Sequence, residues 1–395
     1  MMMFAVRFCC AAVLLAVATA DAAGPSSTLQ IEPMPILTGP DAFRFTQSRA
    51  AVIPGDRPRV LLTTQATEKG GAHGYRDLYE LQSSDGGRTW TEPKVIDNLR
   101  REKMPGGDER VIGDVWPQWH AATGVVLATG KTFTFRGGKT EDRSAERVSY
   151  TVYDPAQRTW SGLQLLELPT SDHAGQPMIA ANAGCNQRYD LPNGEILLPI
   201  RYRGPQSHYV TLVARCRFDG AMLTYVEHGS ELSVPRGRGL YEPSVVGSGG
   251  RYFLTLRADD TAYVARSNDG IRYEPIVEWR YDDGKPLGSY NTQQHWVAHG
   301  DRLWLVYTRR GAKNDHILRH RAPLFIAAVD RDRLCVLRAT EQVLIPENDA
   351  SLGNFGVTDF SASETWVITS EEALHRQREQ DRNKVLAARV LWPDG

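Results

Sequence analysis

Long apolar runs, surplus charge and cysteine are all scarce in this chain of 395 residues. Beyond the N-terminal region, no stretch approaches the roughly 20 apolar residues that a transmembrane helix requires. Lysine and arginine total 46 against 47 aspartate and glutamate, and a formal charge of −1 gives no electrostatic surplus for a nucleic-acid backbone. We therefore expect no membrane span and no nucleic-acid partner.

The five cysteines exclude a disulfide-rich scaffold. Cys9 and Cys10 lie in the apolar N-terminal stretch, which leaves Cys185, Cys216 and Cys335. These three are too few for a disulfide framework and too scattered for a metal knuckle. Either one bridge or three buried thiols fits the pattern.

The histidine spacing does not indicate a metal centre. His316 and His320 are four residues apart, as are His295 and His299, but this spacing brings two imidazoles together only on a helix. Both pairs fall in segments of loop or strand character, and the H-E-x-x-H motif is absent. We expect no metal and no other cofactor.

The first 20 residues have the pattern of a secretory signal. Arg7 is their one charged residue, an apolar run continues through Val17, and Ala18-Thr19-Ala20 provides the small residues that a signal peptidase cleaves. We expect residues 1–20 to be removed and residues 21–395 to form a single domain. The mature protein would be secreted or periplasmic, and its oligomeric state is left open.

The rest of the chain has the composition of an all-β protein, with 35 Gly, 22 Pro and 35 aromatic residues. Convincing helical periodicity is confined to residues 371–382. Turns rich in Gly, Asp, Asn and Pro separate short runs that we expect to be strands. These runs are 59–64, 125–129, 195–200, 209–218, 252–257, 262–266, 303–308, 324–329, 365–369 and 385–392.

One turn pattern repeats along the chain. Residues 83–90 read S-x-D-x-G-x-T-W, a tight hairpin turn closed by a tryptophan. A looser copy occupies residues 267–273, and a remnant lies at 153–160. Because the pattern suits a structural turn, we do not assign chemistry to Asp85 or Asp269.

The turn at 83–90 resembles the Asp-box, or BNR repeat, of the sialidase superfamily. That resemblance implies a six-bladed β-propeller, and roughly 330 residues would allow six blades of about 50 to 60 residues each. It also implies a glycan substrate. We therefore expect one sialidase-like propeller domain.

Residues 241–273 carry the resemblance further. In the family, a glutamate precedes a strand, an arginine ends the next strand, and an Asp-box follows. On that match Glu242 is similar to the active-site glutamate and Arg257 to one of three substrate-binding arginines. A guanidinium presents a rigid pair of donors to a carboxylate, which suits such a site.

The remaining family positions match more loosely. Arg49, followed by small and apolar residues, is similar to the first arginine, with Arg44 as a rival. Arg321, just before an expected strand, is similar to the third. Glu371 is similar to the final glutamate that steadies the first arginine.

Two departures remove the bond-breaking groups of the family. The segment that should hold the tyrosine nucleophile, 353–357, contains Phe355 and no phenol. The loop at 65–76 that should hold the acid/base aspartate offers Glu68 and His73 but no Asp, and Asp77 beyond it is a doubtful substitute.

A dense polar segment at 289–296 offers replacements. Tyr290 would act as nucleophile or acid and His295 as general acid or base, while Asn291 and Gln293 would bind sugar hydroxyls.

Two further groups extend this set of candidates. His316 would act as a second general acid or base, and Arg309 would bind substrate. His120, close to two tryptophans that would stack on sugar rings, and Gln187 are additional binding candidates.

These residues predict a secreted glycoside hydrolase of the sialidase-like type, acting on a glycan that bears a carboxylate. The missing tyrosine counts against release of sialic acid itself. One alternative is a polysaccharide lyase, in which arginines neutralise a uronate while a His or Tyr takes the α-proton. The other is a glycan-binding propeller without catalysis.

Overall fold

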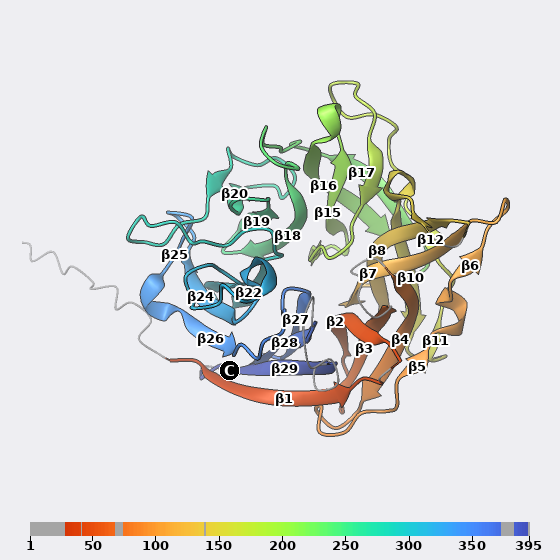
Figure 1. Cartoon of the computed structure of the whole chain (residues 1–395), viewed down its shortest axis with the longest axis horizontal. Coiled ribbons are helices and arrows are strands. Elements are labelled where there is room, and N and C mark those ends of the chain that lie inside the picture. The colour runs from red at the N-terminus through yellow and green to blue at the C-terminus, as the bar shows by residue number, and fades with distance from the viewer. Residues whose placement is uncertain (1–27, 41, 68–73, 138–139, 373–382, 394–395) are drawn as a thin grey trace, which may run out of the picture.

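The computed structural model describes residues 28–40, 42–67, 74–137, 140–372 and 383–393. In these ranges the chain forms six antiparallel sheets around a central axis, as Figure 1 shows. The architecture is a six-bladed β-propeller, which confirms the expected fold. The expected signal sequence, the loop candidates Glu68 and His73, and residues 373–382 of the expected helix lie outside the described residues.

Each sheet forms one blade, whose strands follow one another from the axis outward. One blade contains β2 (Arg44–Ile53), β3 (Arg59–Thr67), β4 (Tyr75–Ser83) and β5 (Lys94–Val95). The next contains β7 (Glu109–His120), β8 (Val125–Arg136), β10 (Val148–Asp154) and β11 (Thr159–Trp160), with β6 (Glu102–Lys103), β9 (Thr140–Glu141) and β12 (Gln164–Leu165) attached. The third contains β13 (Ile179–Asn182), β15 (Ile196–Arg203), β16 (Tyr209–Phe218) and β17 (Leu223–His228), with β14 (Tyr189–Asp190) attached to β15.

The other three blades follow the same plan. The fourth contains β18 (Tyr241–Ser248), β19 (Arg251–Arg257), β20 (Tyr263–Ser267) and β21 (Val277–Glu278). The fifth contains β22 (His295–His299), β23 (Arg302–Tyr307), β24 (Leu324–Asp330) and β25 (Cys335–Val336), with β26 (Gln342–Ile345) attached. The sixth contains β27 (Phe355–Ser361), β28 (Glu364–Ser370), β29 (Lys384–Leu391) and β1 (Gln30–Thr38). Short 3₁₀ helices occupy connections at Asp97–Leu99, Arg143–Ala145, Pro205–Ser207, Leu318–His320 and Arg338–Thr340.

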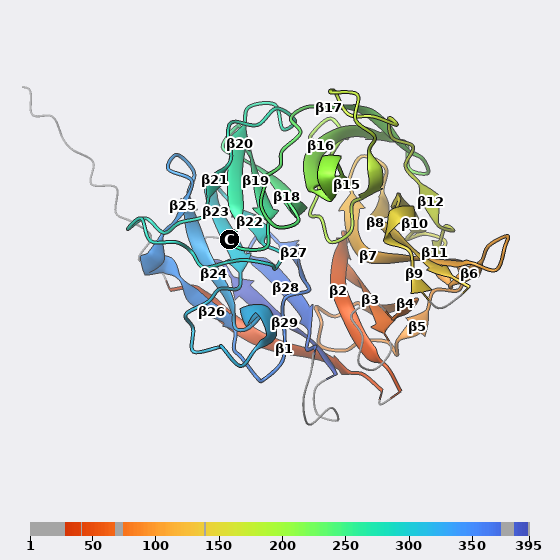
Figure 2. The same ribbon diagram turned by 45° about the horizontal axis from the view of Figure 1, so that its top comes forward.

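The wheel closes by pairing strands from the two ends of the described chain. β1 is the outermost strand of the sixth blade and runs antiparallel to β29, from the pair Gln30–Leu391 to the pair Thr38–Lys384. Both views show β1 beside β29 (Figure 1 and Figure 2). The pairing joins the first and last blades without an open seam.

The hydrophobic core is divided between neighbouring blades. One cluster joins Leu127 and Tyr150 of one blade to Leu198 and Leu212 of the next. Because blades pack face to face, middle strands such as β15 are buried on both faces and read as continuous apolar runs. The expected strands at 59–64, 209–218 and 385–392 are confirmed as β3, β16 and β29.

The two clearest turn repeats have matching hydrogen bonds. In each, Gly87 or Gly270 donates its backbone N–H to the hydroxyl of Ser83 or Ser267, at 2.9 Å. The closing aromatic residue then donates to the carbonyl of that glycine: the Trp90 indole at 3.1 Å and the Tyr273 hydroxyl at 3.0 Å. Both turns follow the third strand of their blade.

Cys185, Cys216 and Cys335 are free and buried, so the alternative of three thiols holds. Among the described residues, no helix is both long and apolar enough to cross a bilayer.

Candidate active site at the propeller axis

Two cavities lie at opposite ends of the propeller axis. The inner strands line the first cavity with residues nearer their N-terminal ends and the second with residues nearer their C-terminal ends. β2 supplies Gln47 to the first cavity and Val52 to the second, and β7 supplies Asp114 and Trp119 in the same way. The first cavity measures about 270 Å³ and the second about 680 Å³.

The first cavity is the one rich in ionisable groups. Its described lining contains seven basic and four acidic side chains. The basic ones are Lys131, Arg143, Arg201, Arg238, Arg257, Arg319 and Arg321, and the acidic ones are Asp114, Glu141, Glu146 and Glu242. This excess of cations among the lining residues favours an anionic ligand.

Glu242 and Arg257 form an ion pair at one wall of this cavity. The Nη1 group of Arg257 donates to Oε2 of Glu242. β18 pairs irregularly with β19 between Tyr241 and Ser244, and Glu242 adopts a left-handed backbone with φ of 45°. Burial alone would raise the pKa of Glu242, but the charge and hydrogen bond of Arg257 hold that pKa below its ordinary value. Glu242 is therefore a carboxylate at neutral pH.

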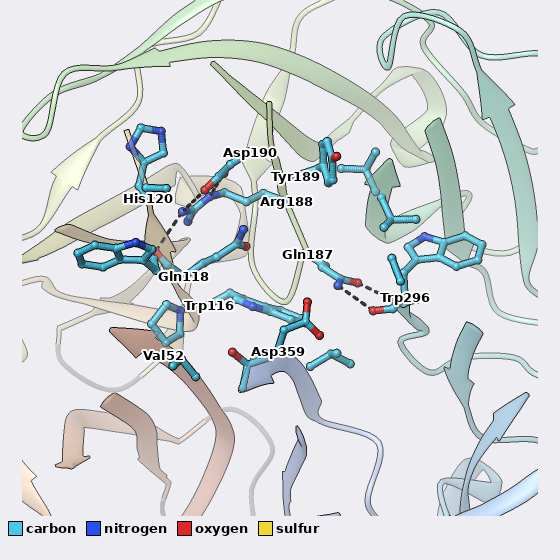
Figure 3. Close-up of a pocket in the computed structure, with 18 of the residues that line it drawn as sticks. Val52, Trp116, Gln118, His120, Gln187, Arg188, Tyr189, Asp190, Trp296 and Asp359 are labelled. Atoms are coloured by element: carbon cyan, nitrogen blue, oxygen red, sulfur yellow. Dashed lines mark hydrogen bonds and ion pairs between the residues drawn. The ribbon is translucent and has the colours of Figure 1, made fainter. Parts of the chain in front are cut away.

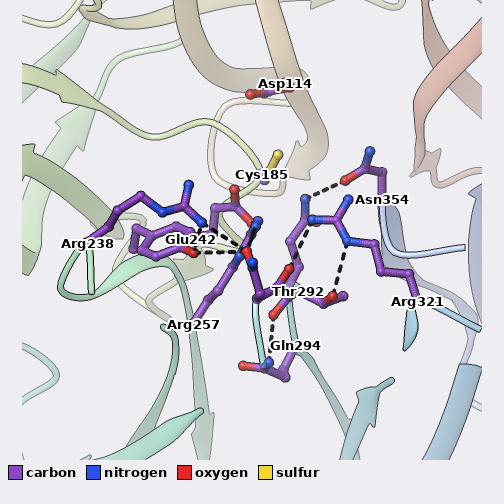
Figure 4. Close-up of polar contacts among 12 residues, drawn as sticks. Asp114, Cys185, Arg238, Glu242, Arg257, Thr292, Gln294, Arg321 and Asn354 are labelled. Carbon is purple, nitrogen blue, oxygen red and sulfur yellow. Dashed lines mark hydrogen bonds and ion pairs between the residues drawn. The ribbon is translucent and has the colours of Figure 1, made fainter. Parts of the chain in front are cut away.

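Asn291 orients three surrounding arginines, Arg238, Arg257 and Arg321, which Figure 4 labels. Its side-chain oxygen accepts from Arg257 at 2.7 Å and from Arg238 at 2.9 Å. Its backbone carbonyl accepts from Arg321 at 3.0 Å. Arg238 is also held by Asp259, which leaves its guanidinium fixed beside that of Arg257. Asn291 thus aligns three guanidinium groups.

Arg319 and Arg321 carry positive charge without a carboxylate partner among the described residues. Arg321 is 6% exposed and donates to the Thr292 hydroxyl at 3.2 Å and to Asn291. Burial, followed by the charges of Arg257 and Arg319, lowers the pKa of Arg321 to about 10. Such an uncompensated group is a ready binding site for an anion.

The opposite wall is a buried network around Lys131. Its ammonium lies 3.0 Å from Oε1 of Glu146 and 3.6 Å from Oδ2 of Asp114. Glu146 also accepts from Arg201 and from Asn182, each at 2.7 Å. Burial raises the pKa of Glu146, but Lys131 and Arg201 bring it below the ordinary value.

Asp114 is the acidic group of this wall that is not fully paired. Its Oδ1 atom is buried and accepts no hydrogen bond from the described residues. Burial raises the pKa of Asp114 above its ordinary value, although Lys131 partly opposes the shift. Figure 4 shows Cys185 between Asp114 and Glu242. The cavity therefore contains Glu242, whose pKa is lowered, and Asp114, whose pKa is raised.

The structure places Arg49 beneath this cavity rather than in its lining. Arg49 is fully buried and donates to the carbonyls of Phe355 and Val115 and to Gln293. β2 is bulged between Thr46 and Arg49, which directs Arg49 into the interior while Gln47 lines the cavity. We therefore leave Arg49 out of the binding site.

Glu371 does not reach Arg49 either. Its Oε1 atom accepts from Asn348 at 3.1 Å. The neighbouring Glu372 instead accepts from Asn354, which lines the cavity, at 2.7 Å. Glu372 is thus the carboxylate of this segment nearest the site.

His295 and Gln293 lie on the axis, between the two cavities. His295 is fully buried, with Nδ1 at 2.8 Å from the Ser244 hydroxyl and Nε2 at 3.1 Å from Gln293. Burial and the charge of Arg49 hold the pKa of His295 well below its ordinary value. His295 is a neutral structural residue, whereas Gln293 lines the cavity.

Three other candidates lie outside the cavity lining. The Tyr290 hydroxyl is 2.7 Å from Nδ1 of His320. His316 is half exposed beside Glu347, at 3.2 Å. Arg309 forms a two-bond ion pair with Glu341. The sequence analysis assigned these residues to one site, but none of them lines the first cavity in the structure.

His120 and Gln187 lie in the second cavity, which Figure 3 shows. His120 uses both ring nitrogens, with Thr123 and with the carbonyl of Gly194. The amide of Gln187 pairs with both backbone groups of Trp296. These side chains are satisfied by the protein and line the second cavity, whereas Glu242 lines the first.

Asp114, Lys131 and Arg238 are among the cavity residues that sequence reasoning missed. No spacing pattern could have identified them, because Asp114 and Lys131 lie on β7 and β8 of the second blade, whereas Arg238 precedes β18 of the fourth. Arg319 lay in the same short basic run as Arg321, and that run was the one signal available.

The six blades and the axial cavity define a sialidase-like β-propeller. Among solved structures, a protein of unknown function from Dyadobacter fermentans matches 91% of this chain and 99% of its own, with 15% identity and a TM-score of 0.64. Trypanosoma rangeli sialidase matches with 13% identity and a TM-score of 0.60, over 91% of this chain and 57% of its own. A Hadza microbial sialidase matches with 12% identity and a TM-score of 0.60, over 88% of this chain and 66% of its own.

No protein-family model and no curated protein matches the sequence. Because the identities are this low and the chain spans under two thirds of each sialidase, the likeness shows the fold alone.

Proposed function

We propose that this protein is a glycoside hydrolase acting on a glycan whose sugar carries a carboxylate. The observation that supports it is the convergence of Arg257, Arg319 and Arg321 with the carboxylate of Glu242 in one axial cavity. A secreted or periplasmic location, from the N-terminal pattern, is part of the proposal.

The arginines would bind the acidic group of the substrate. Arg319 is exposed and has no hydrogen bond or ion pair with the described residues, and partial desolvation together with the charges of Arg257 and Arg238 lowers its pKa. The pKa of Arg321 is also lowered, by burial and by the positive charges of Arg257 and Arg319. A carboxylate bound between them would relieve this repulsion and accept charge-assisted hydrogen bonds.

Asp114 and Glu242 would carry the proton transfers. Glycoside hydrolysis needs one carboxyl group to protonate the leaving oxygen and one carboxylate on the other side of the scissile bond. A pair whose environments push their pKa values apart meets this requirement. We assign Asp114 as the proton donor and Glu242 as the carboxylate that activates water or stabilises the developing positive charge.

The test is a screen of the purified protein against sialosides, uronic-acid oligosaccharides and neutral glycosides, with product masses recorded. We expect a water-added product from an acidic class and none from neutral glycosides. Glu242→Gln should lose turnover, whereas Glu274→Gln, which changes a surface residue paired with Arg266, should keep it.

The other outcomes would replace the proposal. An unsaturated product that absorbs in the ultraviolet would make the protein a lyase. Binding of an acidic glycan without turnover, unchanged in Glu242→Gln, would make it a binding propeller.

A further inference from the structure

We infer that His173, His228 and Glu231 form a site for a divalent transition-metal ion, with zinc the best match, at the outer edge of the β13–β17 blade. Each residue offers one ligand atom, and these atoms lie within 4.8 Å of one another. None of the three lines either axial cavity, so this site is separate from the proposed active site.

The ligand atoms are already close to coordinating distances. Nε2 of His228 is 2.9 Å from Oε1 of Glu231, and Nδ1 of His173 is 3.6 Å from the same oxygen. Bonds of about 2.0–2.2 Å to a tetrahedral ion place neighbouring ligands about 3.3–3.6 Å apart. The cluster therefore needs only small adjustments to surround one ion.

Buried hydrogen bonds hold His228 in a ligating orientation. The His228 side chain is 3% exposed and ends β17. Its Nδ1 atom lies 2.8 Å from the Tyr225 hydroxyl, which leaves Nε2 directed at Glu231. Metal-binding histidines commonly have such an oxygen partner on the second ring nitrogen.

The backbone of His173 is fixed as well. Its N–H donates to Oε1 of Glu231 at 2.8 Å. The turn that carries it is closed by Asp172, whose Oδ1 accepts from the backbone of Ala174 and of Gln176. Metal binding would thus link this turn to the connection that follows β17.

The ring of His173 is the part that must move. It stacks on the ring of His228 with centroids 4.2 Å apart and planes 11° apart. Parallel rings cannot both direct a lone pair at one ion, so the ring of His173 must rotate. Its side chain is 62% exposed, which makes a change of rotamer inexpensive.

The ligand set selects the metal. Two imidazoles and one carboxylate suit zinc and related ions, whereas calcium and magnesium prefer oxygen ligands. These residues line a hollow of about 570 Å³, which leaves room for water as a fourth ligand. The basic residue in that hollow, Arg272, is paired with Asp269 at 3.0 Å.

The test is a zinc titration of untagged, chelator-treated protein by calorimetry, with cobalt absorption as a second readout. We expect one site, with at least a tenfold loss of affinity in His173→Ala and Glu231→Gln. Tyr225→Phe should weaken binding about tenfold, because it removes only the partner of His228. Calcium should not compete.

The second cluster of the described residues, His316 with Glu347 and Asp349, provides the matched control. His316→Ala should bind zinc like the parent protein. The inference is overturned if His173→Ala binds zinc with parental affinity, or if only His316→Ala loses it. His173 is exposed, so its variant should fold, and a thermal melt of each variant checks this.

Discussion

Asp114 and Glu242 line the same cavity, and the protein shifts their pKa values in opposite directions. Asp114 is buried with Oδ1 unpaired, which raises its pKa, whereas Arg257 holds the pKa of Glu242 below its ordinary value. Relative to their ordinary values, Asp114 binds its proton more tightly and Glu242 binds its proton less tightly. This asymmetry underlies the first prediction.

Asp114→Asn should reduce hydrolysis of glycosides with poor leaving groups by at least about 100-fold, because the donated proton is lost. Activated aryl glycosides, which need no such proton, should be affected far less. Because Asp114 acts when protonated, the parental rate should fall as pH rises through its raised pKa. The pH profile of kcat/KM measures this.

If Asp114→Asn keeps the parental rate and pH profile, Asp114 is not the proton donor. The proposal that the protein is a hydrolase would not be affected. Glu242→Gln serves as the comparison, because it should lose activity on both glycosides with poor leaving groups and activated aryl glycosides.

Arg321→Met should make the protein more stable while weakening binding of an acidic ligand. The pKa of Arg321 is lowered to about 10, so its charge is less favourable in the folded state by about 3 kcal/mol. Loss of its two hydrogen bonds offsets about 2 kcal/mol of that gain. We expect a net gain of about 1 kcal/mol in urea unfolding at pH 7.

The sign of the Arg321 contribution to the free energy of unfolding can be checked at high pH. A base with a lowered folded pKa makes the protein more stable as pH rises between about 10 and the ordinary guanidinium range. The parent should therefore recover part of the difference there. A variant clearly less stable than the parent at pH 7 would contradict this account of Arg321.

Arg309→Gln should destabilise the fold by about 3 kcal/mol and leave ligand affinity unchanged. Arg309 holds Glu341 with two hydrogen bonds, and the same carboxylate accepts from the hydroxyls of Tyr281 and Tyr307, each at 2.5 Å. Removing the cation leaves a largely buried carboxylate without its counter-charge.

Acid unfolding gives an independent readout of this pair. Burial raises the pKa of Glu341, but Arg309 and the hydroxyls lower it overall, so its stabilisation is present above the ordinary carboxyl range and lost as pH falls through the folded pKa. In the variant the Glu341 pKa is no longer held down by a cation, so the difference in stability between parent and variant should shrink as pH falls through this range. Reduced ligand affinity at full stability would instead return Arg309 to the binding site.

The sequence predicted the middle and outer strands better than the inner ones. β16 was expected at 209–218 and has those bounds, because every second residue from Val210 to Phe218 is apolar and buried. β7 was not expected as a whole, since it contains Pro117 and a bulge with Asp114 at a φ of 53°. Inner strands bend to place polar groups at the axis, so their sequences lack the regular alternation of polar and apolar residues that identifies a strand.

The same contrast explains the site. Glu242 and Arg257 could be found together because they lie on adjacent strands, 15 residues apart. Asp114 approaches them only through the closure of the wheel, which no local pattern encodes. The position of Arg49 below the cavity could not be predicted, because a bulge that the sequence does not reveal decides which residue of β2 lines the cavity.

Gly87→Ala should destabilise the protein more than Gly86→Ala, although both glycines have positive φ, of 80° and 72°. Alanine in this conformation costs about 1 kcal/mol at either position. A Cβ at Gly87 would also lie 2.6 Å from the sulfur of Met34 and 2.9 Å from the buried ring of Trp366. At Gly86 its nearest neighbour would be Phe360, at 3.7 Å.

The crowding at Gly87 should add about 2 kcal/mol, because Trp366 is fully buried and cannot yield as the end of Met34 can. Met34 lies on β1 and Trp366 on β28, so the turn at 83–90 packs against the blade that closes the wheel. Urea unfolding of the two variants measures the difference directly. Equal losses of unfolding free energy in the two variants would mean that Trp366 and Met34 move to accommodate the added methyl group. The turn would then stabilise only its own blade.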